Sequence, residues 1–99
     1  MDSKEKRAYR RMRARHKKKL VELAKEYREY DWCFFHENVE TMLRFMYEYF
    51  ESGNNVWQVE ESRMEIVESL REVLELMRDE ETRGEAYKKI GEDLEMWWD

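Results

Sequence analysis

Apolar residues recur at steps of three and four along most of this chain, which is the spacing of one face of an α-helix. Lys and Arg fill most of the positions between them near the start of the chain. This pattern predicts a first amphipathic helix over residues 3–27, with Ser3 as its N-cap. Its apolar stripe consists of Tyr9, Met12, His16, Leu20, Leu23 and Tyr27.

A second helix is predicted between Asp31, a natural N-cap, and Gly53, which suits the positive φ of a helix C-cap. Its expected core stripe is Trp32, Phe35, Val39, Met42, Met46 and Phe50, with Leu43 beside it. A second, mixed stripe is Phe34, Asn38, Thr41, Phe45 and Tyr49. A helix that is apolar over so much of its circumference is usually central or shared between subunits.

A third helix is predicted over residues 58–79, and a short fourth helix over residues 85–97. Asn55 followed by Gln58 resembles a capping box for the third helix. Thr82 and Gly84 predict the break before the fourth. The third helix has the apolar stripe Ile66, Val67, Leu70, Val73, Leu74 and Met77, and the fourth has Tyr87, Ile90, Leu94 and Trp97.

Composition supports this helical interpretation. The chain has 99 residues, no proline, three glycines and 43% charged residues, which is typical of helices rather than of sandwiches or barrels. We expect a single all-α domain over residues 1–99, a small helical bundle of three long helices and a short C-terminal helix. Because so short a chain buries a limited core, we also expect a homo-oligomer. The pair Trp97–Trp98 would anchor on another subunit or on a partner.

The sequence also bears on the compartment. No apolar run approaches the roughly 20 residues that span a bilayer, and no stretch has the pattern of a signal peptide. Cys33 is the single cysteine, so it has no partner for an internal disulfide. We therefore expect no membrane association and a reducing cytoplasm.

Charge is divided unevenly along the chain. Residues 1–28 hold twelve Lys and Arg against four Asp and Glu, and the remainder holds seven against twenty. The basic segment either docks on the acidic part, within or between subunits, or receives a phosphorylated partner. It carries no recognised DNA-binding motif, and the acidic remainder would repel a duplex. The residues expected to hold phosphate are Arg10, Arg13, Lys17 and Lys18.

Two patterns could concern metals. Cys33 and His36 lie one helical turn apart, but a zinc site usually needs three or four protein ligands, and the sequence supplies no second Cys/His cluster. We therefore expect a buried Cys33 and a partly exposed His36, and neither a metal nor a cofactor.

The second pattern is a pair of E-x-x-E motifs, Glu37 with Glu40 and Glu65 with Glu68. They resemble the all-α nucleotide pyrophosphohydrolases, which hold magnesium with E-x-x-E and a later E-x-x-D. This resemblance implies facing carboxylates around a divalent cation that bridges phosphates. Glu68 stands where that family has aspartate, and the rest of the family pattern is missing.

An aromatic and amide set is the remaining candidate for chemistry. Flat rings stack on a nucleobase, and asparagine reads its edge with a donor and an acceptor together. We predict a nucleotide site, expected at a subunit interface, in which Trp57 and Tyr49 stack, Asn54 and Asn55 recognise polar edges, and the basic residues neutralise phosphate. The full set is Tyr30, Trp32, Phe34, His36, Phe45, Tyr49, Asn54, Asn55 and Trp57.

The runs RRMRARHKKKLVELAKEYREYDWCFFHENV and MYEYFESGNNVWQVEESRMEIVESLREVLEL resemble a group of small, mostly unassigned proteins of tailed bacteriophages. The shared features are a basic leader, a WD or DW turn, a MYEYY-like helix and a GNNVW loop. The resemblance implies phage origin and the cytoplasm of the bacterial host, without an agreed biochemical activity. Small phage proteins of this class often counter host defence.

The leading hypothesis is therefore a non-enzymatic counter-defence protein that sequesters a small nucleotide immune signal, such as a cyclic nucleotide. The first alternative is an inhibitor that binds a host defence protein through its acidic third helix. The second is a metal-dependent nucleotide pyrophosphohydrolase that uses Glu37, Glu40, Glu65 and Glu68.

Overall fold

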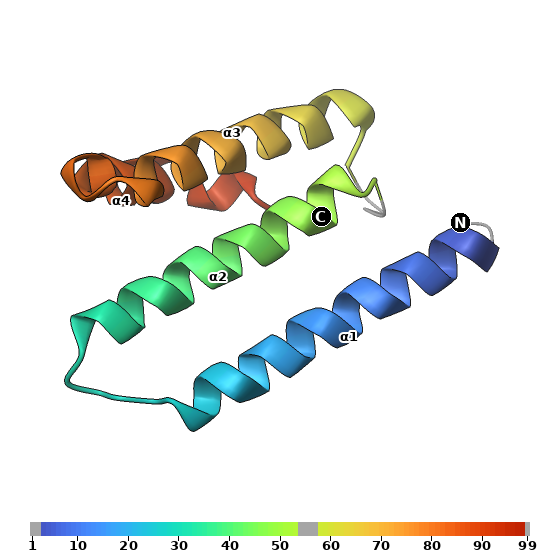
Figure 1. Ribbon diagram of the computed structural model, residues 1–99. Helices are drawn as coiled ribbons and strands as arrows, with labels where there is room; N and C mark the ends of the chain where they lie inside the picture. Colours follow the sequence, from blue (N-terminus) through green and yellow to red (C-terminus); the bar gives the residue numbers. More distant parts are fainter. Residues whose placement is uncertain (1–2, 54–57, 99) are drawn as a thin grey trace. The chain divides into compact units, whose positions relative to one another are not determined.

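The computed structural model describes residues 3–53 and 58–98. Four α-helices follow one another: α1 (Ser3–Lys25), α2 (Trp32–Glu51), α3 (Glu60–Arg78) and α4 (Arg83–Asp93) (Figure 1). Short 3-10 helices follow α3 and α4, namely η1 (Glu80–Thr82) and η2 (Leu94–Met96). These ranges contain no strand, so the predicted all-α class is confirmed.

The chain forms two compact units, residues 1–39 and residues 40–99, and the division falls within α2. The first unit thus holds α1, the turn after it and the start of α2. The second holds the rest of α2, α3 and α4. No helix in the described parts of the chain combines the length and the apolar character that a bilayer crossing requires.

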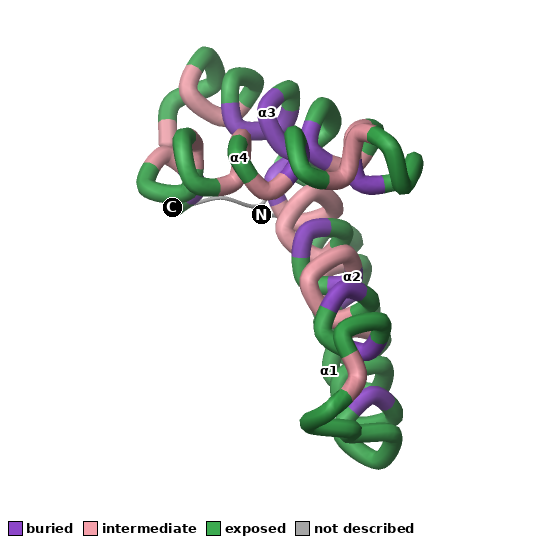
Figure 2. Tube along the Cα trace, turned by 90° about the vertical axis from the view of Figure 1, so that its left-hand side faces the viewer, coloured by how far each residue is buried: buried purple, intermediate pink, exposed green. Residues whose placement is uncertain are grey.

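In the first unit, α1 is exposed along most of its length (Figure 2). Of its expected stripe, Met12 and Leu23 are buried, whereas Leu20 and Tyr27 are exposed. The helix ends at Lys25, two residues earlier than predicted. It therefore has only a narrow buried face, as its mostly charged sequence requires.

The turn between α1 and α2 confirms Asp31 as the N-cap. The Asp31 Oδ1 atom accepts a hydrogen bond from the backbone N–H of Cys33 at 2.9 Å. The Asp31 carbonyl accepts bonds from the N–H groups of Phe34 and Phe35, at 3.1 and 3.2 Å. These bonds satisfy backbone donors that the first turn of a helix otherwise leaves unpaired.

The expected core stripe of α2 is wrong over its first part. Trp32 and Phe35 are 66% and 62% exposed, and Met42 is exposed as well. The mixed stripe supplies buried residues instead, Phe34 and Thr41. The reason is that the chain before α2 packs on its other side, where the Tyr27 and Phe34 rings meet edge to face at 5.9 Å. Near the end of α2, Leu43 and Phe50 are buried as the stripes predicted.

In the second unit, α3 has the apolar stripe that its sequence predicts. Leu74 is half-buried. Figure 2 shows buried positions recurring along α3, and the buried members of the stripe are Ile66, Val67, Leu70, Val73 and Met77. Arg63, on the first turn of α3, donates through Nη1 to the carbonyl of Phe50 at 2.8 Å. This bond satisfies a carbonyl at the C-terminal end of α2.

Of the two predictions about the α2–α3 connection, the one for the end of α2 is confirmed and the one for the start of α3 is wrong. Gly53 has φ of 76°, which confirms it as the residue that ends α2. The predicted capping box is wrong, because α3 begins at Glu60 with Val59 at its N-cap and no side-chain cap. The Gln58 side chain has another partner: its Nε2 donates to the carbonyl of Trp98 at 2.6 Å.

The break between α3 and α4 comes from Asp79 and Thr82 rather than from Gly84, which lies inside α4. Asp79 Oδ1 accepts a bond from the N–H of Glu81 at 3.0 Å. Thr82 Oγ1 donates to the carbonyl of Leu76 at 2.7 Å. Side chains that bond to nearby backbone in this way offer an alternative to the helical ladder and end it.

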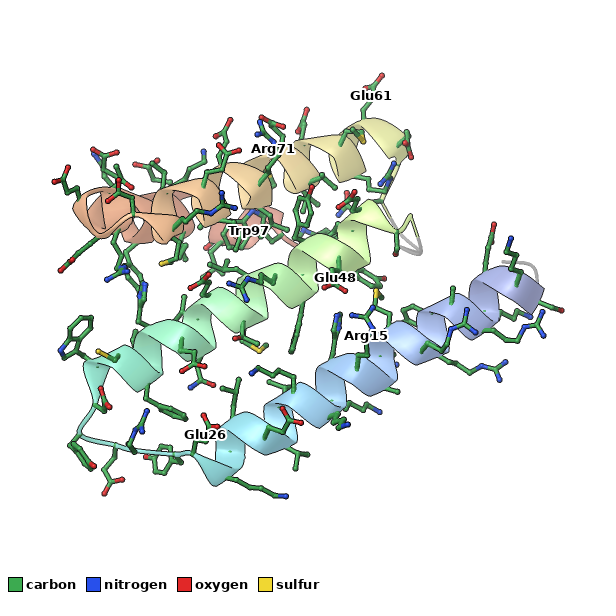
Figure 3. All side chains as sticks on the ribbon, viewed as in Figure 1. Arg15, Glu26, Glu48, Glu61, Arg71 and Trp97 are labelled. Atoms are coloured by element: carbon green, nitrogen blue, oxygen red, sulfur yellow. The ribbon has the colours of Figure 1, made fainter. Side chains whose placement is uncertain are left out.

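α4 packs along α3 in the opposite direction. Glu72 of α3 pairs with Lys89 of α4, and Ser69 of α3 bonds to Asp93 of α4, so the partners occur in reverse order. This is the arrangement of an antiparallel helical hairpin. Trp97 lies beside α3 (Figure 3) and is buried within its own chain, which corrects its assignment as an anchor for another subunit. Trp98 is exposed.

Candidate functional site

A groove of about 460 Å³ lies in the first unit, where the end of α1, the turn and the first turns of α2 meet. Leu20 and Ala24 line it from α1, and Tyr27 lines it from the turn. Phe34, Phe35 and Asn38 line it from α2. Aromatic, aliphatic and amide groups thus converge on one concave surface, which is the usual composition of a small-ligand site.

The aromatic residues of the groove differ in exposure. Phe34 is buried, whereas Tyr27 and Phe35 are 65% and 62% exposed. The buried ring is held by the edge-to-face contact with Tyr27 and by the Arg28 guanidinium, whose carbon lies 5.8 Å from the ring centroid. Phe34 therefore serves as packing, and the two exposed rings are the ones that can contact a ligand.

Charge in the groove is partly neutralised by the turn itself. Asp31 forms an ion pair with Arg28, with Oδ2 and Nε 3.2 Å apart. Its other carboxylate oxygen caps α2. Glu29 also lines the groove. The groove is therefore suited to a neutral ring rather than to a phosphate group, because an anion beside Glu29 would be repelled.

Asn38 supplies the hydrogen-bonding group of the groove. Its Nδ2 donates to the carbonyl of Phe34 at 2.9 Å, one helical turn earlier. That bond uses one of two amide hydrogens, so the side chain keeps an acceptor oxygen and a second N–H. A donor and an acceptor side by side can match the edge of a nucleobase.

The face of α1 that enters the groove continues toward the N-terminus as a basic row. Steps of four, three, four and three residues lead from Ala24 through Leu20, Lys17 and Arg13 to Arg10, so these residues share one side of the helix. The three basic residues are exposed, and within residues 3–53 and 58–98 none of them forms an ion pair with a carboxylate. They are available to an external anion.

The fourth predicted phosphate ligand lies apart from this row. Lys18 lines a second, shallower groove on α1 together with Arg11 and Arg15. A step of one residue turns a helix by about 100°, so Lys17 and Lys18 cannot address the same ligand face. The structure thus keeps three of the four predicted basic residues together and separates Lys18 from them.

The remaining predicted site residues belong to three different parts of the chain. His36 is buried in the first unit. Tyr49 belongs to the second unit, where its ring meets Phe50 edge to face at 5.1 Å. Asn54, Asn55 and Trp57 lie outside the described residues.

The metal patterns have no counterpart in the described geometry. Among the residues that the structure places, no group of three or more His, Cys, Asp and Glu side chains is arranged to hold a metal ion. Glu40 pairs with Arg44, and Glu68 pairs with Arg71. Cys33 is exposed and His36 is buried, the reverse of the expectation, because this part of α2 turns its Phe34 side inward.

The second unit contains a polar cluster between α3 and the C-terminal segment. Ser69 Oγ donates to Asp93 Oδ2 at 2.5 Å and accepts from the Trp97 indole Nε1 at 2.9 Å. Lys89 Nζ lies 3.0 Å from Asp93 Oδ2 and 3.1 Å from Glu72 Oε2. The Ser69 bond, aided by Lys89, lowers the pKa of Asp93 below its usual value. Every one of these groups bonds to another, so the cluster holds the hairpin together.

Sequence reasoning missed several residues of the groove. Leu20 and Tyr27 looked like core, and neither Ala24, Arg28 nor Asn38 was expected at a site. The available signal was the crowding of aromatic residues around the Asp31 cap, which predicts rings on both sides of a tight turn. Asn38 could be found only by knowing which stripe of α2 faces α1.

Known proteins do not resolve the function, since no family model, curated protein sequence or solved structure matches this chain.

Proposed function

We propose that this chain is a non-enzymatic nucleotide-binding protein and that the groove of the first unit receives the base. One observation carries the proposal. The face of α1 that lines an aromatic and amide groove continues as a row of exposed basic residues. A nucleotide has the same two parts, a flat ring and an anionic chain, joined in the same order.

The base end is supported by Tyr27, Phe35 and Asn38. The two exposed rings offer flat apolar surfaces, and stacking of a base on an aromatic side chain is worth about 1–3 kcal/mol. The Asn38 amide supplies a donor and an acceptor for the edge of the base. Phe34 and Leu20 form the apolar surface beneath.

The phosphate end is supported by Lys17 and Arg13. Lys17 is three residues from Leu20, so its Cα lies about 4.5 Å further along the helix axis. Arg13 follows at about 6 Å beyond that. Lysine and arginine are the side chains that bind phosphate, as a point charge and as a two-pronged donor respectively. The first unit as a whole holds twelve Lys and Arg against seven Asp and Glu, which favours an anion.

The biological role that we propose is counter-defence in an infected bacterium, through sequestration of a nucleotide signal. This part rests on the resemblance to tailed-phage proteins. A sequestering protein needs to bind its ligand and has no need to change it. The role predicted for Asn54, Asn55 and Trp57 as ligand contacts stays a prediction. A homo-oligomeric assembly stays a prediction as well.

A second candidate function is inhibition of a host protein by direct binding. Tyr30 and Trp32 favour it, because they are 82% and 66% exposed on the same turn and do not line the groove. Exposed aromatic residues are frequent anchors of protein interfaces. This function predicts a stable complex with one host protein and no retained small molecule.

The test is retention of nucleotides by the purified protein. The protein is mixed with mononucleotides, cyclic dinucleotides and short linear oligonucleotides, passed through a size filter, and heated to release what it holds. Sequestration predicts a ligand that is retained and then recovered intact. A chemically altered ligand would replace the proposal with an enzymatic one. If all compounds stay free, the nucleotide proposal is wrong, and capture of a host protein becomes the relevant assay.

A matched pair of variants locates the site. Phe35→Ala removes an exposed ring that lines the groove, and Trp32→Ala removes an equally exposed ring, on the same helix, that does not. We expect the first variant to weaken retention at least tenfold, the equivalent of about 1.4 kcal/mol, and the second to leave it unchanged. Equal effects of the two variants would contradict the assignment of the groove.

A further inference from the structure

The basic row on α1 is longer than a single nucleotide needs. Beyond Lys17 and Arg13 it continues through Arg10 to Lys6, again at steps of three and four residues, and Lys6 is exposed. With a rise of about 1.5 Å per residue, the distance along the axis from Leu20 to Lys6 is roughly 21 Å. The row is thus an extended line of positive charge that starts at the groove.

No acidic side chain of α1 interrupts this line. α1 contains two acids, Glu5 and Glu22, and neither falls on the three-and-four spacing that joins Lys6, Arg10, Arg13 and Lys17. Within the described ranges, none of these four basic side chains is paired with a carboxylate. The line therefore presents four uncompensated charges to a single partner.

The shape of a ligand decides how many of these charges it reaches. A mononucleotide or a compact cyclic dinucleotide keeps its phosphates beside its bases, so it contacts the end of the row nearest the groove. A linear strand carries one phosphate per nucleotide and can follow the row. Proteins that bind single strands combine such a charged track with aromatic rings on which bases stack.

We propose that the ligand is a short, linear, single-stranded oligonucleotide, with one base in the groove between Tyr27 and Phe35 and its phosphates along Lys17, Arg13, Arg10 and Lys6. This inference rests on the proposed function and adds the class of nucleotide. A single strand needs only one face of one helix, and the basic row of α1 supplies such a face.

The experiment compares tetramers of thymidylate and of uridylate with the corresponding monophosphates and with a cyclic dinucleotide, by titration at several salt concentrations. A tetramer that carries a 5′ phosphate has four phosphate groups, one for each basic residue of the row, and each neutralised phosphate of a single strand contributes about −0.7 to the slope of log K against log salt. We expect a slope of about −2.8 for such a tetramer, and weaker binding of both the monophosphates and the cyclic compound.

Variants on two sides of α1 provide the control. Lys6→Ala should make the tetramer slope shallower by about 0.7 and leave monophosphate binding unchanged. Lys18→Ala, on the other side of the helix, should change neither. All these positions are exposed, and alanine is the best helix former, so circular dichroism should show unchanged helicity.

The outcomes separate this inference from the function on which it rests. If the monophosphate or the cyclic compound binds as tightly as a tetramer, the proposal of a linear oligonucleotide is overturned while nucleotide binding stands. The same conclusion follows if Lys6→Ala leaves the tetramer slope unchanged. If every compound stays free, both proposals fail. A tetramer-specific affinity that depends on Lys6 and not on Lys18 supports both.

Discussion

The two compact units of this chain differ in how many apolar residues they bury and in their charge. Among the residues that the structure describes, the first unit, residues 1–39, holds three buried apolar residues and the second, residues 40–99, holds nine. The first has twelve Lys and Arg against seven Asp and Glu, and the second has seven against seventeen. Of the aromatic side chains that the structure describes, four are exposed in the first unit and one in the second.

The difference indicates a division of roles. Buried apolar area is the main source of folding free energy, so the α3–α4 hairpin is where the stability of this chain is concentrated. Exposed aromatic and basic groups add little to stability and are the groups that contact ligands. We infer that the second unit maintains the fold and the first unit presents the binding surface.

Several acidic residues of the second unit form ion pairs within it. Arg71 of α3, which is labelled in Figure 3, pairs with Glu68 and with Glu75 on the same helix. Arg63 pairs with Glu60 in the same way. In contrast, the basic row of the first unit has no such partners in the described ranges. Local pairing makes the acidic helix a stable surface, and the absence of such pairs in the basic row leaves that row available to an anion.

The largest expected effect comes from leucine truncation in the two units. Leu70→Ala, at a fully buried position of α3, should lower the free energy of unfolding by about 2–5 kcal/mol. Leu20→Ala, at a position 38% exposed, should lower it by less than about 1 kcal/mol. Urea denaturation followed by circular dichroism measures both. Similar losses at both positions would contradict the concentration of stability in the second unit.

A smaller effect is expected at the C-terminal tryptophans. Trp97→Phe removes the indole N–H that Ser69 accepts, and leaves a buried hydroxyl with one partner fewer. We expect a loss of about 1–3 kcal/mol. Trp98→Phe, at an exposed position, should change stability by no more than about 0.5 kcal/mol. Thermal denaturation of the two variants compares them, and equal shifts in Tm would show that the Ser69 bond adds nothing.

The smallest effect is a dependence on pH. The bond from Ser69 and the ion pair with Lys89 hold the pKa of Asp93 below the ordinary aspartate value of 3.8. Its contribution to stability is therefore complete above that value and is lost as the pH falls through the lower folded-state pKa. Asp93→Asn should make stability less dependent on pH in this acid range. Glu92→Gln, at the exposed neighbouring position, is the control, and an identical acid profile for Asp93→Asn and the parent would contradict the role of the cluster.

How far the sequence predicts this structure depends on the helix. In α3 one stripe is apolar and the rest is charged, so Ile66, Leu70 and Val73 could be assigned to the core correctly. In α2 two stripes are apolar or aromatic, and periodicity alone does not choose between Phe34 and Phe35. That choice is made by the packing of Tyr27 and Phe34 across the turn, which is a tertiary contact.

The candidate site was predictable in chemistry and less so in position. Aromatic, amide and basic groups were expected to act together, and Arg10, Arg13 and Lys17 do share one face. Lys18 could have been separated from them by counting helical steps. The groove could not be predicted from the sequence, because Leu20 and Asn38 are eighteen positions apart and come together only through the fold of the turn.

Amide hydrogen exchange of the whole chain, with and without a bound tetranucleotide, tests the division of roles most directly. Without ligand, we expect slow exchange in α3 and fast exchange in α1, because protection follows local stability. With ligand, protection should increase in α1 and in the turn before α2, and should stay the same in α3 and α4. Slow exchange throughout α1 in the free protein, or a ligand effect confined to α3 and α4, would contradict the account.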